Sequence, residues 1–280
     1  MNPFRVNPHP EPQASKYKVP FTPLTKFPCV SRETFTICMN EHASSLSEGQ
    51  ILRFQKVCSS FEIYISGEML DKFQIYLNQI LDWNKRVHLV SKGDAKPERI
   101  LRHFVDSLTI FSAIGRSASG GKAIEIQPRA KLLDIGAGAG FPSIPIKIIR
   151  EDISLSLVES IRKKSLFLQK LIKDLKLENV SVINKRAEDL IDARDYKENF
   201  DIVTAKALGK IKDTTELAAS FLKPKGLLIA YKGEKIEEEM KECKEKNFLI
   251  KNKILIKVPD FGLKRMIVVI EKISSTDETD

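Results

Sequence analysis

The sequence lacks long apolar runs. No stretch of about 18 or more apolar residues occurs, which excludes a membrane-spanning helix. No apolar segment follows a basic start at the amino terminus, so a secretory signal is not expected. The sequence therefore predicts a soluble protein.

Cysteine is also scarce. The four cysteines form no C-x-x-C pair and no cysteine–histidine cluster of metal-ligand spacing. They are Cys29, Cys38, Cys58 and Cys243. We interpret them as free thiols of a protein in the reducing cytoplasm, and we expect no metal site.

Length and charge leave several classes open. The 280 residues suffice for one large domain with an appendage, or for two small domains. The net charge of +9 favours an anionic partner such as nucleic acid. Solvated lysine faces would give the same value, so charge alone does not decide between them.

Proline is concentrated at the amino terminus, where seven of the thirteen prolines lie between Pro3 and Pro28. Proline removes a backbone donor and disfavours helix in the preceding residue, and this segment shows no helical or strand periodicity. Residues 1–45 are therefore predicted to be a disordered tail, or residues upstream of the true start. Residues 274–280 are expected to form a flexible tail.

Helical periodicity marks residues 46–114. Apolar residues recur at helical spacing at Met69, Phe73, Tyr76, Leu77 and Ile80. A second amphipathic pattern follows Pro97. A Gly/Ser-rich stretch over 115–130 then predicts a loop or linker.

Short apolar strands alternate with helical stretches from residue 131 onward. The strands are predicted at 131–135, 154–158, 180–183, 200–205 and 227–231. This alternation predicts a parallel sheet covered on both faces. Two further strands, 248–258 and 266–270, are joined by a short connection, which requires antiparallel pairing. The order resembles the class I methyltransferases, which are α/β proteins with a Rossmann-like, mostly parallel seven-stranded sheet and an antiparallel C-terminal hairpin, here over 131–273.

The loop after the first of these strands carries the pattern D-x-G-x-G-x-G, formed by Asp134, Gly136, Gly138 and Gly140. A dinucleotide fingerprint would need its third glycine where Phe141 stands, and no Walker A lysine follows. The pattern resembles the first motif of S-adenosylmethionine (SAM) methyltransferases. SAM carries an ammonium rather than phosphates, and a carboxylate such as Asp134 can accept from that ammonium.

Two acids at the ends of the next strands agree with this cofactor. Glu159 ends the second strand and could accept from the ribose hydroxyls. Glu188 lies in an acidic turn after the third strand, where the adenine would bind. Each of them could instead be a solvated loop acid.

Signatures along residues 69–272 resemble one family, the 16S ribosomal RNA guanine-N7 methyltransferases, also called the glucose-inhibited division protein B family. They are Trp83–Lys85, Arg102–Leu108, Asp134–Pro142, Glu159–Lys164, Arg186–Leu190, Thr204–Ala207 and Tyr231–Gly233. The resemblance implies methylation at N7 of a guanosine in the 530 loop of 16S rRNA, with SAM as donor. It also implies that the partner is the small ribosomal subunit, and we expect a monomer.

The family pattern implies cofactor contacts at Gly136, Phe141, Ala187, Glu188 and Lys206. Three residues depart from it: Ser143 replaces the usual glycine, His88 the usual asparagine, and Lys206 the usual arginine. Lysine loses the planar fork that binds bidentately, so Lys206 is the least direct of these assignments.

Guanine N7 carries a lone pair and no proton, so the reaction needs alignment rather than a general base. We therefore expect no catalytic triad. The candidates for positioning the substrate are Lys206, Lys232 and His103, and those for binding RNA are Arg102, His103, Lys163, Lys164, Arg186 and Lys232.

Several alternatives stay open at this stage. His103 could pack against the glycine loop, or it could contact a base with Asp106 orienting it, whereas Asp106 could instead pair with Arg102. Trp83 is a core anchor or a stacking platform. The same fold could also methylate another RNA or a protein, or bind SAM or RNA without catalysis. Phe141 disfavours an NAD-dependent oxidoreductase.

Overall fold

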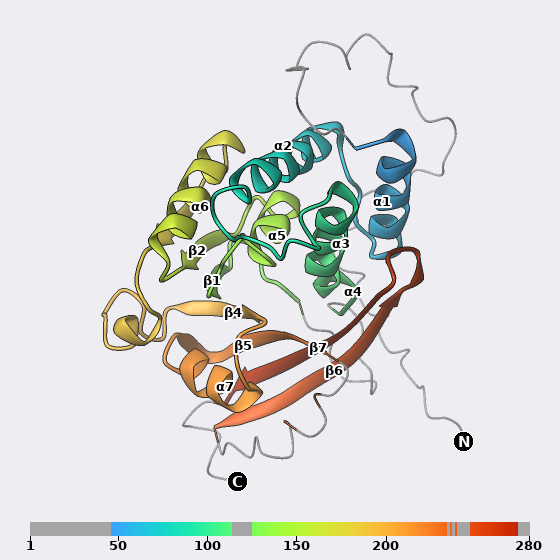
Figure 1. Cartoon of the computed structure of the whole chain (residues 1–280). Helices are drawn as coiled ribbons and strands as arrows, with labels where there is room; N and C mark the ends of the chain where they lie inside the picture. Colours follow the sequence, from blue (N-terminus) through green and yellow to red (C-terminus); the bar gives the residue numbers. More distant parts are fainter. Residues whose placement is uncertain (1–45, 114–124, 234–235, 237–238, 240–246, 274–280) are drawn as a thin grey trace, which may run out of the picture. The chain divides into compact units, whose positions relative to one another are not determined.

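The structure is a computed structural model that describes residues 46–113, 125–233, 236, 239 and 247–273 (Figure 1). The two expected tails, 1–45 and 274–280, lie outside the described residues, and so does most of the expected linker.

Four helices form the first part: α1 (Glu48–Ser60), α2 (Gly67–Trp83), α3 (Pro97–Leu108) and α4 (Ile110–Ala113). Local chemistry sets where they begin. Ser47 and Gln50 form a reciprocal capping box on α1, the Ser66 side chain accepts from the Met69 amide at the start of α2, and α3 starts with a proline. The helical periodicity seen in the sequence is confirmed, because the buried residues of α2 are Phe73, Tyr76, Leu77 and Ile80.

Seven strands form one sheet in the order β3-β2-β1-β4-β5-β7-β6. They are β1 (Lys131–Ile135), β2 (Ser154–Val158), β3 (Val180–Ile183), β4 (Phe200–Lys206), β5 (Leu222–Lys232), β6 (Phe248–Val258) and β7 (Leu263–Lys272). The first five pair in parallel, and β7 pairs antiparallel with both β5 and β6. The predicted fold class is confirmed, although β5 begins at Leu222 rather than at residue 227, and β7 at Leu263 rather than at 266.

Helices cover the two faces of the sheet unequally. α5 (Ser143–Ile149) and α6 (Arg162–Asp174) follow β1 and β2, and α7 (Ile211–Ala219) follows β4 on the other face (Figure 1). Two 3-10 turns complete the described elements, η1 (Glu188–Leu190) after β3 and η2 (Pro259–Phe261) in the β6–β7 connection.

The N-terminal helices share one hydrophobic core with the face of the sheet that carries α5 and α6. Phe73 of α2 contacts Phe54 of α1 and Phe104 of α3, with ring centroids 5.1 and 5.0 Å apart. Burying one such ring stabilises the fold by about 2 kcal/mol. This packing brings α2 and α3 against the loop after β1.

Candidate cofactor and substrate site

The glycine loop after β1 has a backbone that requires glycine. Gly136, Gly138 and Gly140 have φ values of +73°, +57° and +93°, which other residues rarely adopt. A Cβ on Gly140 would lie 2.6 Å from the Tyr76 hydroxyl oxygen and 2.7 Å from Cδ1 of Ile144. Gly140 therefore lets α2 approach the loop.

Tyr76 fixes the loop from outside the sheet. Its hydroxyl donates to the Ala139 carbonyl at 2.5 Å, and its ring stacks on Phe141 with centroids 5.5 Å apart. In the sequence this residue was one apolar position of a helix, and nothing in its local pattern indicated the contact.

Glu159, at the end of β2, also holds the loop. Its side chain is 5% exposed, with Oε2 accepting from the Gly138 amide at 2.8 Å and Oε1 from the Ile161 amide at 2.7 Å. It is therefore not a solvated acid. Each carboxylate oxygen has a second lone pair, so Glu159 can still accept from ribose hydroxyls.

Asp134 is buried at the carboxyl end of β1, with 1% exposed. Thr204 Oγ1 donates to its Oδ1 at 3.1 Å, and Oδ2 has no hydrogen-bond partner among the described residues. Burial raises the pKa of Asp134 to about 7, against lowering effects of Ser143, Thr204 and Lys206. A buried carboxylate oxygen that lacks a donor fits the ammonium group of SAM.

Ser143 belongs to the same network. It is fully buried, and its hydroxyl lies 2.8 Å from Thr204 Oγ1. The serine thus extends the hydrogen bonds around Asp134, which a glycine at this position would not do. His88 is exposed, and nothing in the structure explains its departure from the family pattern.

Aromatic and cationic groups gather beside the loop. His103 stacks on Phe141 with centroids 5.1 Å apart and an interplanar angle of 24°. Lys206 Nζ lies 5.3 Å from the centre of the Phe141 ring and 5.9 Å from that of Tyr231. Burial, and to a lesser extent Lys206, lowers the pKa of His103 to about 4, so its imidazole is neutral at neutral pH.

Asp106 makes a pairing that differs from both sequence alternatives. Arg265 Nε donates to Oδ1 at 2.7 Å and Nη2 to Oδ2 at 2.8 Å, and Lys206 Nζ lies 2.8 Å from Oδ2. Arg102 instead donates to the Gly262 carbonyl at 2.9 Å. The sequence did not single out Arg265, because it is 159 residues from Asp106.

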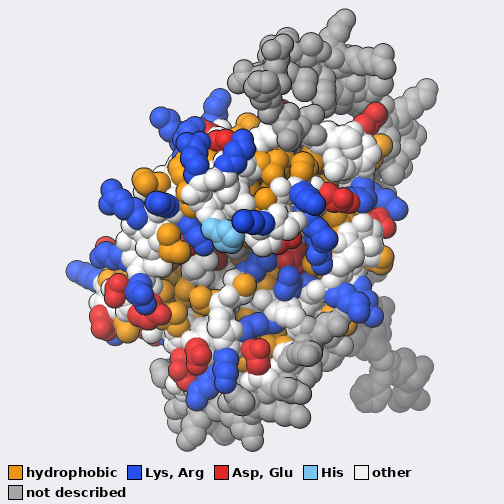
Figure 2. Space-filling model, in the orientation of Figure 1, with side chains coloured by type: hydrophobic (Ala, Val, Ile, Leu, Met, Phe, Trp, Pro, Cys, Tyr) orange, Lys and Arg blue, Asp and Glu red, His pale blue; other side chains and the backbone are white. Residues whose placement is uncertain are grey.

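The other predicted residues lie around the carboxyl ends of the strands, which we call the rim of the site. Lys163 and Lys164 lie in the first turn of α6, and Arg186 and Glu188 are exposed around the buried Ala187. Lys232 Nζ donates to the Gly209 carbonyl at 2.6 Å and pairs with Glu239 at 3.1 Å. Figure 2 shows Lys and Arg side chains scattered over the face it draws, including the region of α6, with Asp and Glu side chains among them.

Trp83 packs edge-to-face on Phe167, with centroids 5.6 Å apart, which agrees with the core-anchor interpretation.

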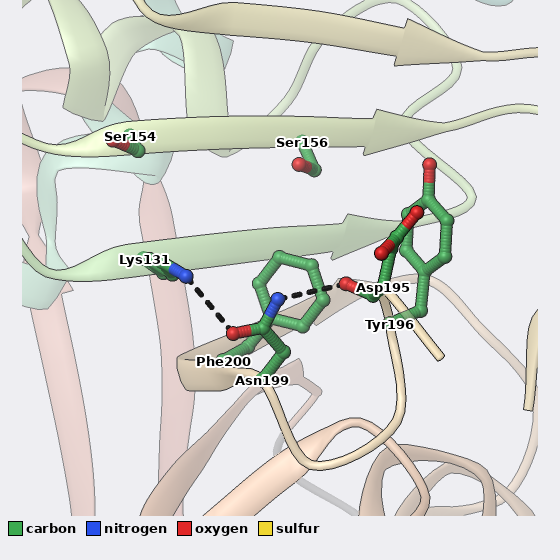
Figure 3. A pocket seen from close by; sticks show the side chains of 7 residues that line it. All are labelled: Lys131, Ser154, Ser156, Asp195, Tyr196, Asn199 and Phe200. Atoms are coloured by element: carbon green, nitrogen blue, oxygen red, sulfur yellow. Dashed lines mark hydrogen bonds between the residues drawn. The ribbon is translucent and has the colours of Figure 1, made fainter. Parts of the chain in front are cut away.

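A hollow lies at the amino ends of β1 and β2 (Figure 3). Lys131 Nζ donates there to Asn199 Oδ1 at 2.9 Å, and Asn199 Nδ2 to the Asp195 carbonyl at 2.7 Å. None of the predicted site residues lines it, and the glycine loop is at the other end of the strands. Within the described ranges, no helix is long and apolar enough to cross a membrane, and no group of three or more His, Cys, Asp or Glu side chains could hold a metal.

The strand order, the glycine loop and the two buried acids together define a class I SAM-dependent methyltransferase. The family model described as GidB, rRNA small subunit methyltransferase G, matches residues 69–268, so the chain belongs to this family of rRNA methyltransferases.

Three relatives carry the name ribosomal RNA small subunit methyltransferase G. The protein of Desulfitobacterium hafniense (strain Y51) is 37% identical over 235 residues, which are 82% of this chain and 92% of the relative. That of Desulforamulus reducens is 37% identical over 80% of this chain and 91% of its own. That of Clostridium botulinum (strain Loch Maree / Type A3) is 34% identical, with 80% and 91% covered.

Among solved structures, M. jannaschii TYW2 in complex with AdoMet aligns with a TM-score of 0.45 and 19% identity, over 68% of this chain and 80% of that chain. The strand order, and not this likeness, identifies the fold.

Proposed function

We propose that the protein methylates N7 of a guanosine in the 530 loop of 16S rRNA. The family supports small-subunit rRNA as the substrate, since three relatives bear that name. The observation that supports a guanine acceptor is the Lys206 cation beside the stacked rings of His103 and Phe141, where it can donate to O6 and leave N7 free.

The cofactor would be held by residues at the carboxyl ends of β1 to β4. When bound, SAM supplies an electrophilic methyl group on a sulfonium. Asp134 Oδ2 would accept from its ammonium, and Glu159 from its ribose hydroxyls. The remaining cofactor residues would be Gly136, Gly138, Gly140, Phe141, Ala187, Glu188 and Lys206.

The substrate side needs orientation more than acid–base chemistry. Guanine presents N7 and O6 as acceptors, so a cation at Lys206 can donate to O6 and leave N7 free for the methyl group. A neutral His103 does not repel the positive charge that forms on the guanine when N7 is methylated, whereas a protonated imidazole would. Alignment of this kind accelerates a reaction by removing orientational entropy from the barrier.

Basic side chains around the rim would contact the RNA backbone. Arg102, Lys163, Lys164, Arg186 and Lys232 are the candidates. Phosphate contacts fix the register of the RNA without reading its sequence, so these residues would raise affinity rather than choose the guanosine.

Methyl transfer to ribosomal subunits tests the proposal. Purified enzyme and tritiated SAM are incubated with 30S subunits from a strain lacking the enzyme, and N7-methylguanosine is mapped in the rRNA. We expect label at one guanosine of the 530 loop. Absence of label from 16S rRNA would reject the function, and label elsewhere in it would reject the position.

A further inference from the structure

A buried ionic cluster joins three segments that are far apart in the chain. Asp106 of α3, Lys206 of β4 and Arg265 of β7 form it, and we call it the Asp106 cluster. The exposed fractions of their side chains are 3%, 11% and 22%. A carboxylate this deeply buried is costly unless cations and donors surround it, and here two cations do.

Arg265 fixes the carboxylate. Its guanidinium binds both oxygens of Asp106 through Nε and Nη2, in the planar fork geometry that sets both distance and angle. Its third nitrogen, Nη1, donates to the Lys232 carbonyl at 3.2 Å, so β5 holds the guanidinium from the other side. The C-terminal hairpin therefore determines where the Asp106 carboxylate lies.

Asp106 in turn holds Lys206. A lysine has a flexible four-carbon stem, and burial favours loss of its charge. Burial does lower the pKa of Lys206, and Asp106 is the strongest of the groups that oppose this. Arg265 also lowers the pKa of Lys206, and Asp134 raises it. The Lys206 nitrogen thus lies beside the rings of Phe141 and Tyr231, and Asp106 is the carboxylate that most favours its charged form.

We propose that Asp106 is a positioning residue of the methyl transfer: it holds the Lys206 ammonium, charged and in place, at the edge of the glycine loop, and Arg265 holds Asp106. This rests on the proposed function, because Lys206 is the group taken to orient the guanine. It makes the C-terminal hairpin part of the active site, although no residue of that hairpin is taken to touch substrate.

The first test is Asp106→Asn, with Asp152→Asn as a matched control. Asp152 accepts from Arg150 Nε at 2.7 Å and from Nη2 at 2.8 Å, the same fork geometry just before β2, at the amino ends of the strands. Activity is measured as kcat per site that binds S-adenosylhomocysteine, so partly unfolded protein does not count. We expect Asp106→Asn to lower kcat about 100-fold, as misplacement of a positioning group does, and Asp152→Asn to leave it unchanged.

Rescue separates positioning of a charge from a structural role. Arginine keeps its charge when buried, without a carboxylate to hold it. Adding Lys206→Arg to Asp106→Asn is therefore expected to restore kcat about tenfold or more, which corresponds to about 1.4 kcal/mol of barrier. If Lys206→Arg alone is active and the double variant is no better than Asp106→Asn, the proposal is wrong. It is also wrong if Asp106→Asn retains its kcat.

A readout without turnover is the reactivity of the lysine amine. Labelling with acetic anhydride at neutral pH, followed by peptide mass spectrometry, measures the neutral fraction of each lysine. We expect Asp106→Asn to raise labelling of Lys206 about tenfold, because loss of the carboxylate lowers the pKa of the amine and enlarges its neutral fraction. Lys72, whose side chain is 12% exposed and pairs with Glu68 and Glu151, is the internal control and should not change. Equal labelling of Lys206 in wild type and variant would overturn the proposal.

These outcomes also separate the proposal from the function on which it rests. If the wild type fails to label 16S rRNA, the function is rejected, and the Lys206 labelling still decides the role of Asp106. If Asp106→Asn does not fold, Arg265→Gln replaces it, because this variant leaves Asp106 and Lys206 as a neutral pair. We expect it to lower kcat about tenfold through loss of orientation, and an unchanged kcat would overturn the proposal.

Discussion

Replacing Gly140 by alanine would put a methyl group into space that two other side chains already fill. The new Cβ would lie 2.6 Å from the Tyr76 hydroxyl oxygen and 2.7 Å from Cδ1 of Ile144, at a φ of +93°. Backbone strain at such a φ costs about 1–3 kcal/mol, and overpacking costs about 1–3 kcal/mol more. The sum is about 2–6 kcal/mol, with about 4 kcal/mol as the central value.

The measured quantities are the Tm and the affinity for S-adenosylhomocysteine. At about 2–4 °C per kcal/mol for a domain of this size, Gly140→Ala should lower the Tm by roughly 8–16 °C. Affinity for the ligand should fall as well, because α2 or the loop must move. Adding Tyr76→Phe removes one of the two clashing atoms, so the double variant should lose less than the sum of the single losses.

Gly262→Ala is the matched control. Gly262 also has a positive φ, +54°, but nothing lies within 4 Å of its added Cβ, so only backbone strain applies. If Gly140→Ala and Gly262→Ala lower the Tm equally, close approach of α2 is not the reason for the glycine. If adding Tyr76→Phe does not reduce the loss of Tm caused by Gly140→Ala, the Tyr76 hydroxyl is not the clashing group.

Four further predictions concern the charged side chains of the site. Affinity for S-adenosylhomocysteine should rise as pH increases through about 7, because Asp134 ionises there and a charged carboxylate binds an ammonium more strongly than a neutral carboxyl group does. Asp134→Asn should remove this dependence in calorimetric titrations. Stability of the free protein should change with pH in the opposite direction to ligand affinity. The native state binds the Asp134 proton more tightly than the unfolded state does, so the Tm should fall as pH rises from about 4 to 7. Asp134→Asn should not show this fall. Glu159→Gln should weaken ligand binding at least about tenfold, since one amide nitrogen would then face a backbone N–H, from Gly138 or Ile161, and leave it unpaired; an affinity equal to wild type would show that Glu159 does not hold the loop. Lys232→Ala should reduce the slope of log affinity for rRNA against log salt by about 0.7–0.9, the value for one phosphate contact, and an unchanged slope would exclude Lys232 from the RNA interface.

The order of elements was predictable because it depends on short-range patterns. Apolar runs of strand length, helices between them and a short last connection predict a parallel sheet closed by an antiparallel hairpin, and the structure has that sheet. Strand lengths were less predictable. β5 begins earlier than expected because Phe200 pairs with Leu222 across a register shift, a long-range pairing that the local pattern does not reveal.

The cofactor-binding residues of the loop were also predictable, because they are close together in the sequence. The residues that hold the loop and its neighbours in place were not, because they are far away in the chain. The spacing of Asp134 and the three glycines indicated SAM, since it differs from the spacing of dinucleotide and phosphate-binding loops and adds a carboxylate for an ammonium. The role of Tyr76 depends on α2 lying against a loop 63 residues away. That of Arg265 depends on β7 entering the sheet beside β5, and this places its guanidinium on α3.

The sequence by itself determined the fold class, the cofactor and the family, because each depends on residue types at fixed short spacing along the chain. Only the tertiary structure decided which charges neutralise one another. Asp106 could have oriented His103 or paired with Arg102, both close to it in sequence, but its carboxylate lies against Lys206 and Arg265. Burial makes an unpaired charge costly, so the partner is chosen by which cations the packed elements bring to the same place.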